Sequence, residues 1–149
     1  MPEKTPADVH EYLQQVGADF EILSQQERLL TLRDYGDNVE PLDPALKNED
    51  NYVPGCASAT YMICTLDDEG RLHFHGDSES FISKGYIHIL TTALSGLTPQ
   101  MIATEVEPAV NAFADQAGVK MSMIASRANV FERIFHFMQV KAVEAAAKK

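Results

Sequence analysis

The feature that most constrains the fold is a change of hydrophobic period near residue 77. Residues 57–66 are rich in β-forming side chains, residues 67–70 (DDEG) have the composition of a turn, and residues 71–76 alternate between polar and apolar. This order predicts a β-hairpin. From Phe81 onward the apolar residues follow a helical period, so the hairpin is expected to pack against helices.

The expected register of the hairpin follows from the turn. A four-residue turn pairs Ile63 with Phe74 and Cys64 with His73. His73 and His75 then share one face of their strand, with Cys64 beside them. A metal site of Cys64, His73 and His75 is therefore geometrically conceivable, although the sequence offers no evident fourth ligand.

Capping signals predict helices before and after the hairpin. They are expected to begin at Thr5 and Ser24 before it, and at Asp77 or Ser78, Thr98, Glu107 and near Ser126 after it. No internal repeat or linker divides the chain, so residues 1–149 are expected to form a single domain. The predicted fold is α+β: a small antiparallel sheet, made of the hairpin plus a further strand, with helices packed on one face.

Charge and cysteine usage exclude several classes of function. With 22 acidic and 12 basic side chains the formal net charge is −10, which repels nucleic acid. The longest apolar run, residues 59–64, is too short to span a bilayer, and residues 1–30 lack a secretory pattern, so the cytoplasm is expected. The acids concentrate in residues 1–55, which form either a solvated face or a surface that steers a partner.

Cys56 is the candidate reactive residue. It follows Pro54-Gly55 at the end of a proline-containing segment, residues 37–55, that is expected to be an irregular loop. Glycine beside a thiol permits close approach of another group, and Ser58 is placed to donate a hydrogen bond to a thiolate. Position alone leaves open whether Cys56 is reactive or structural.

Cys64 and Arg127 also carry groups capable of chemistry. Cys64 lies within a predicted strand, so we expect it to be structural and, in a reducing compartment, unpaired. Arg127 stands at the expected start of the last helix, where a cation is disfavoured. It either pairs with Asp77 or Asp115 or helps to stabilise an anionic sulfur species.

Five stretches, in their order and spacing, resemble the SufE/CsdE family of sulfur-acceptor proteins. They are residues 53–58 (VPGCAS), 72–80 (LHFHGDSES), 82–85 (ISKG), 94–99 (LSGLTP) and 126–129 (SRAN). Together they extend the resemblance over about residues 20–145. The chain departs from the family in having Ala57 and Ala59 where glutamine is frequent, Tyr61 where tryptophan is common, and Val130 where glycine often follows Asn129.

The resemblance implies a function in iron–sulfur metabolism. Cys56 of the G-C-x-S motif, flanked by Gly55 and Ser58, would take sulfur as a persulfide from a pyridoxal-phosphate-dependent cysteine desulfurase of the SufS/CsdA type. It would stimulate that enzyme and deliver the sulfur to an iron–sulfur scaffold complex. Such a protein is a partner-dependent sulfurtransferase accessory with no cofactor or metal of its own.

The resemblance also implies the compact α+β fold shared with IscU-type scaffolds. Asp77, Lys84, Gly85 and Arg127 match recurrent family positions and are supporting candidates. Two other hypotheses stay open at this point: a non-catalytic binding or regulatory module in which Cys56 is structural, and the metal-binding scaffold.

Overall fold

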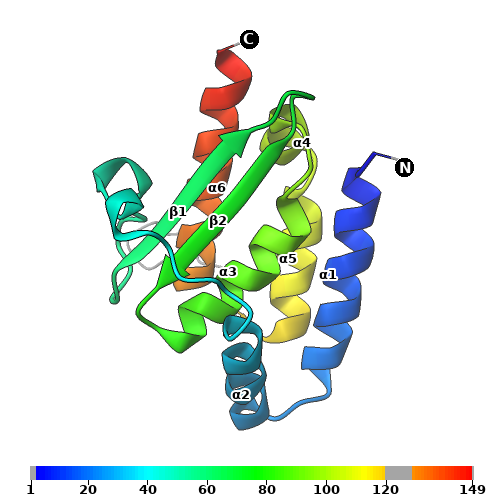
Figure 1. Cartoon of the computed structure of the whole chain (residues 1–149). Helices are drawn as coiled ribbons and strands as arrows, with labels where there is room; N and C mark the ends of the chain where they lie inside the picture. Colours follow the sequence, from blue (N-terminus) through cyan, green and yellow to red (C-terminus); the bar gives the residue numbers. More distant parts are fainter. Residues whose placement is uncertain (1–2, 120–128, 149) are drawn as a thin grey trace.

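The computed structural model describes residues 3–119 and 129–148. It is α+β, as predicted, with helices lying behind a two-stranded antiparallel sheet (Figure 1). The elements in chain order are α1 (Pro6–Glu21), α2 (Gln25–Gly36), the short 3-10 turns η1 (Pro44–Leu46) and η2 (Glu49–Asn51), β1 (Thr60–Leu66), β2 (Leu72–Ser78), α3 (Phe81–Leu94), α4 (Pro99–Thr104), α5 (Glu107–Ala117) and α6 (Val130–Ala147).

The hairpin is present, but its predicted register is wrong by one residue. Cys64 pairs with Phe74, and Ile63 pairs with His75. The cause is the turn: Gly70 adopts a left-handed φ of 78°, and the Asp67 N–H donates to the Arg71 carbonyl over 2.8 Å. Arg71 therefore belongs to the turn rather than to the strand, and the strands shift accordingly.

The register determines which side chains face the helices. Met62, Phe74 and Gly76 are buried on the inner face, whereas His73 and His75 are exposed on the outer face. No third strand forms among the described residues. Isolated bridges occupy the two edges instead, Tyr52 with Tyr61 and Leu72 with Leu97.

Most helix boundaries follow the predicted caps. Ser24 and Glu27 form a reciprocal capping box at α2, and Gly118 ends α5 with a φ of 77°. Two starts differ from prediction. Asp77 and Ser78 remain in β2, so α3 is capped by Ser80.

The second difference concerns α6, which begins at Val130 rather than near Ser126. Asn129 accepts a hydrogen bond from the Glu132 N–H over 3.0 Å, and the Glu132 carboxylate accepts from the Asn129 N–H over 3.3 Å. This capping box satisfies backbone donors that the first turn leaves free. None of the helices in the described part of the chain is both long and apolar enough to cross a bilayer.

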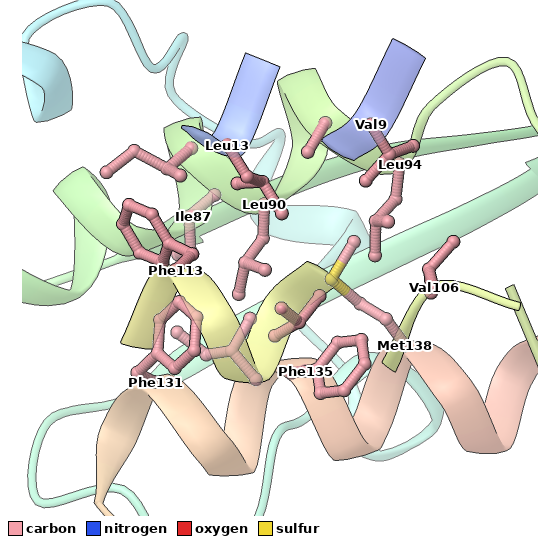
Figure 2. Close-up of a cluster of buried hydrophobic side chains, with 14 of the residues drawn as sticks. Val9, Leu13, Ile87, Leu90, Leu94, Val106, Phe113, Phe131, Phe135 and Met138 are labelled. Carbon is pink, nitrogen blue, oxygen red and sulfur yellow. The ribbon is translucent and has the colours of Figure 1, made fainter. Parts of the chain in front are cut away.

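One hydrophobic core joins the sheet to the helices. Its members from α1, α3, α5, α6 and the segment before α5 converge in Figure 2. The labelled side chains are Val9, Leu13, Ile87, Leu90, Leu94, Val106, Phe113, Phe131, Phe135 and Met138. Since α6 contacts β1 from behind, it can reach the loop that leads into that strand.

Candidate functional site

The segment between α2 and β1, residues 37–59, crosses the hairpin (Figure 1) and carries the candidate cysteine, Cys56, near its end. Asp77 anchors it. The buried Asp77 carboxylate accepts hydrogen bonds from the Leu42 N–H (3.0 Å) and the Ser78 N–H (2.8 Å), and Lys47 Nζ lies 3.8 Å away. Two of these three partners belong to the loop, so Asp77 holds the loop closed against β2.

Closer to the cysteine, the loop is attached to β1. Val53 is fully buried and its N–H donates to the Thr60 carbonyl over 2.8 Å. The rings of Tyr52 and Tyr61 meet edge to face with centroids 5.6 Å apart. Residues 54–59 therefore form a short bend whose two ends are both held by the sheet.

Gly55 is required in this bend for two reasons. Its φ is +83°, a left-handed conformation that disfavours any side chain. In addition, a Cβ at Gly55 would lie only 2.0 Å from Nη1 of Arg133, so the guanidinium occupies the space of a side chain. An arginine of α6 thus packs directly against the residue that precedes Cys56.

Cys56 is partly buried and packs against the hydrophobic core. Burial raises the pKa of the Cys56 thiol above its ordinary value, while a hydrogen bond with the Thr60 side chain and the positive charge of Arg133 lower that pKa in part. Because burial is the largest effect, the resting thiol is protonated at neutral pH. The closed loop therefore stores Cys56 in its less nucleophilic form.

Thr60, rather than Ser58, supplies the hydroxyl beside Cys56. The fully buried Thr60 Oγ1 donates to the Ser58 carbonyl over 3.0 Å and lies 2.9 Å from Oγ of Ser78. A hydroxyl has one hydrogen, which can turn from the Ser58 carbonyl to the sulfur when the thiol loses its proton. Ser58 contributes its backbone carbonyl to this arrangement.

The remaining candidates from the sequence lie elsewhere. Lys84 and Gly85 are on α3, where it crosses α2; a Cβ at Gly36 would lie 2.9 Å from Lys84 Cβ, and one at Gly85 would lie 2.3 Å from the Leu32 carbonyl. Both positions serve helix packing. Arg127 lies outside the described residues.

The metal hypothesis is contradicted by the register. Cys64 lies on the inner face, opposite to that of His73 and His75, because it pairs with Phe74. His73 Nε2 is 2.8 Å from an Asp67 carboxylate oxygen, and His75 Nε2 is 3.0 Å from the Glu40 carbonyl. Within the described ranges, no cluster of three or more His, Cys, Asp or Glu side chains has a metal-binding geometry.

Cys64 lies within β1 and is partly buried, a setting that suits the structural thiol expected from the sequence. Burial raises its pKa to about 11, which leaves it protonated at physiological pH. Both described cysteines are free thiols. The two sulfhydryls therefore differ in setting, since Cys56 lies in the bend before β1 whereas Cys64 lies within β1.

Two residues of the site were missed by the sequence analysis, Arg133 and Thr60. Arg133 falls outside the apolar stripe of its helix and so has the pattern of an ordinary solvated cation. Only the tertiary packing of α6 against Gly55 reveals its position. Thr60 carried a usable signal, since it is a hydroxyl residue within the expected strand, residues 57–66, and follows Cys56 by four positions.

Comparisons with known proteins give matches over most of the chain. The family model described as SufE, Fe-S metabolism associated domain, matches residues 14–142. An uncharacterized SufE-like protein of Synechocystis is 38% identical over 109 residues, covering 73% of this chain and 65% of its own. SufE-like protein 1, chloroplastic/mitochondrial, of Arabidopsis thaliana is 31% identical over 115 residues, covering 76% of this chain and 30% of its own.

Two further matches concern domain context and fold. A chloroplastic quinolinate synthase of Nicotiana tabacum is 32% identical over 129 residues, which are 85% of this chain and 18% of that protein. The chain thus spans less than two thirds of these curated relatives. A hypothetical protein of Thermus thermophilus, solved in solution, superposes with a TM-score of 0.66 at 20% identity, covering 91% of this chain and 96% of its own.

Proposed function

The chain belongs to the SufE family, and from that premise we propose that it accepts sulfur as a persulfide on Cys56 from a pyridoxal-phosphate-dependent cysteine desulfurase. It stimulates that enzyme and passes the sulfur on for iron–sulfur cluster assembly. The observation that carries the proposal is the setting of Cys56, a partly buried thiol on a bend whose loop is held closed by a few hydrogen bonds.

The chemistry is thiol exchange. The Cys56 thiol first loses its proton to solvent or to a base of the desulfurase. The thiolate then attacks the terminal sulfur of the desulfurase persulfide, a new S–S bond forms on Cys56, and the electron pair of the broken S–S bond leaves on the desulfurase cysteine. No net oxidation occurs, because one sulfane sulfur moves from one cysteine to another.

The closed loop can protect the sulfur carried on Cys56 from solvent. An exposed persulfide is lost to reductants and oxidants, and a raised thiol pKa keeps the resting cysteine unreactive. Attack on a persulfide in another protein requires the sulfur to reach it, so the bend at residues 54–59 must open. The contacts to be released are those of Asp77 with the loop and of Val53 with β1.

Partner recognition is expected to use the acidic surface. Residues 1–55 hold 12 acidic and 4 basic side chains, and the loop ending at Cys56 is part of this region. A basic face on the desulfurase would dock here, with association that weakens as salt increases. We expect the protein to act in the cytoplasm; the Arabidopsis relative is named as chloroplastic/mitochondrial.

The burial of Cys56 also suits a second function, a non-catalytic regulatory module in which the thiol only packs. Incubation with a SufS/CsdA-type desulfurase and radiolabelled cysteine separates the two. The acceptor gains one label that a thiol reductant removes, Cys56→Ser gains none, and Cys64→Ser labels like the wild type. Stimulation of the desulfurase by Cys56→Ser to the same level as the wild type would instead establish the regulatory module.

A further inference from the structure

The contact between Arg133 and Gly55 puts a positive charge beside the sulfur-bearing residue. Nη1, Cζ and Nε of Arg133 lie 2.0, 2.6 and 3.0 Å from the position of a Gly55 Cβ. All three distances are shorter than van der Waals contact, so the guanidinium occupies the space that a side chain at position 55 would need. The glycine is therefore the condition for Arg133 to reach this place.

Arg133 also borders open space. With Pro54 it lines a groove of about 480 Å³ between the 49–54 segment and α6. The charged and titratable groups on this groove are Glu49, Asp50, Tyr52, Arg133, His136, Lys141 and Glu144. Arg133 and Lys141 are thus its two permanent cations, and Arg133 is the one that acts on Cys56, whereas Lys141 acts on Cys64.

The positive charge of Arg133 has little effect on the resting Cys56 thiol, but it can stabilise the product of sulfur transfer directly. The resting thiol is neutral, because burial outweighs the effect of Arg133 on it. A hydropersulfide is a stronger acid than its parent thiol, so the loaded cysteine is an anion at neutral pH. An anion in a partly buried position requires a counter-charge or a hydrogen-bond donor.

We propose that Arg133 is the counter-ion of the Cys56 persulfide, holding its terminal sulfur as an anion in the closed loop. This inference rests on the proposed function and deepens it. The planar guanidinium offers five N–H donors to the sulfur, and the Thr60 hydroxyl can supply one more. The pair stabilises the loaded state over the unloaded one, so that loading itself favours closure of the loop.

Arg133 is a positioning residue before sulfur transfer, and after the transfer it contacts the Cys56 persulfide directly. When the desulfurase persulfide is attacked, the negative charge moves from the Cys56 sulfur to the desulfurase cysteine. Loss of a proton from the new hydropersulfide then returns the charge to the acceptor. Arg133 favours this last step and opposes the reverse transfer.

The test loads Cys56 chemically, so that no desulfurase is needed. In a Cys64→Ala background, an aromatic disulfide converts Cys56 to a mixed disulfide and releases one aryl thiolate. Hydrosulfide then attacks the Cys56 sulfur, releases the second aryl thiolate, and leaves the hydropersulfide. Its ionisation is followed against pH by the ultraviolet absorbance of the persulfide anion.

Four variants are titrated beside the parent. Arg133→Gln is expected to raise the persulfide pKa by about one unit, and Arg133→Lys to recover most of that difference. Lys141→Met removes a cation from the same helix and groove, away from Cys56, and is expected to leave the persulfide pKa unchanged. His136→Gln removes the imidazole that lines the same groove and is likewise expected to leave the persulfide pKa unchanged.

An unchanged persulfide pKa in a folded Arg133→Gln protein, or an equal shift in Lys141→Met, overturns the inference. If Arg133→Gln does not fold, a salt titration of the parent and of Arg133→Lys decides. A guanidinium–persulfide pair predicts that 1 M salt raises the persulfide pKa, and no response to salt overturns it.

This test is independent of the sulfur donor. A shifted persulfide pKa together with no labelling by a desulfurase would leave the ion pair standing and remove the proposed function. Labelling with no shift would do the reverse.

Discussion

Removal of the Asp77 side chain should open the loop over Cys56 without unfolding the protein. In Asp77→Ala, two buried backbone donors lose their acceptor, the N–H groups of Leu42 and Ser78. The Ser78 bond is lost whether the loop is open or closed, because that N–H belongs to β2. The Leu42 bond exists only in the closed loop, so its loss acts on the opening equilibrium.

The magnitude follows from the kind of bond. A hydrogen bond to a charged acceptor contributes about 1.5–3 kcal/mol when buried, and the Lys47 ion pair at 3.8 Å, with its lysine side chain 38% exposed, adds less than about 1 kcal/mol. Loop opening should therefore become easier by about 2 kcal/mol. This corresponds to a roughly 30-fold larger open population, since every 1.4 kcal/mol is about tenfold.

The assay is alkylation of Cys56 by iodoacetamide in a Cys64→Ala background, at constant pH and without denaturant. When closing is faster than alkylation, the rate is proportional to the open population. Asp67→Ala is the matched control, because that carboxylate accepts the Glu69 and Arg71 N–H groups, each at 2.9 Å, in the hairpin turn. It has no bond to the loop, so its alkylation rate should equal that of the parent.

Equal alkylation rates in Asp77→Ala and Asp67→Ala would refute the reasoning. A second check separates local from global opening. A local opening exposes little surface, so the Asp77→Ala rate should depend only weakly on low concentrations of urea. A steep dependence would mean that Cys56 reacts through the globally unfolded state.

Three further predictions concern the second thiol, the left-handed glycine and the mobility of the loop. Because burial raises the folded-state pKa of Cys64 from 9.0 to about 11, the folded protein holds the thiol proton more tightly than the unfolded chain, and stability should fall as pH rises from about 9 to about 11. In urea unfolding, Cys64→Ala should lack the part of the decrease in stability that this thiol causes. Gly55→Ala should cost about 1–2 kcal/mol of backbone strain and also displace Arg133, whereas Gly96→Ala, at a φ of 96° with its nearest neighbouring atom 3.4 Å away, should show the strain alone in a thermal melt. Hydrogen exchange should be faster for residues 50–58 than for β1 and β2, Val53 excepted because its N–H is bonded to Thr60; equal protection throughout would contradict a loop that opens.

Local chemistry made much of this fold predictable. The capping box at Ser24 and Glu27 and the glycine at position 118 act within one helical turn, so their effects follow from neighbouring residues. The hairpin followed equally from alternation and a turn. Its register did not, because the left-handed Gly70 places Arg71 in the turn, which is longer than the predicted four-residue turn.

The candidate site, too, was predictable only where neighbouring residues determine it. The motif around Cys56 singled out the thiol, and its loop position follows from the prolines before it. The functions of Asp77 and Arg133 depend on contacts between residues 35 and more positions apart, such as the bond from Leu42 to Asp77 and the packing of α6 on Gly55. No local pattern encodes such contacts, which arise only when the loop and the helices close over the core.

The central claim is that sulfur arrives on Cys56 and on no other residue. The most direct measurement is peptide mass spectrometry after brief incubation with a cysteine desulfurase and cysteine, with free thiols and persulfides trapped by alkylation. We predict one added sulfur atom on the peptide that contains Cys56 and none on the peptide that contains Cys64. Sulfur found on the Cys64 peptide, or an unmodified Cys56 beside an active desulfurase, would contradict the account.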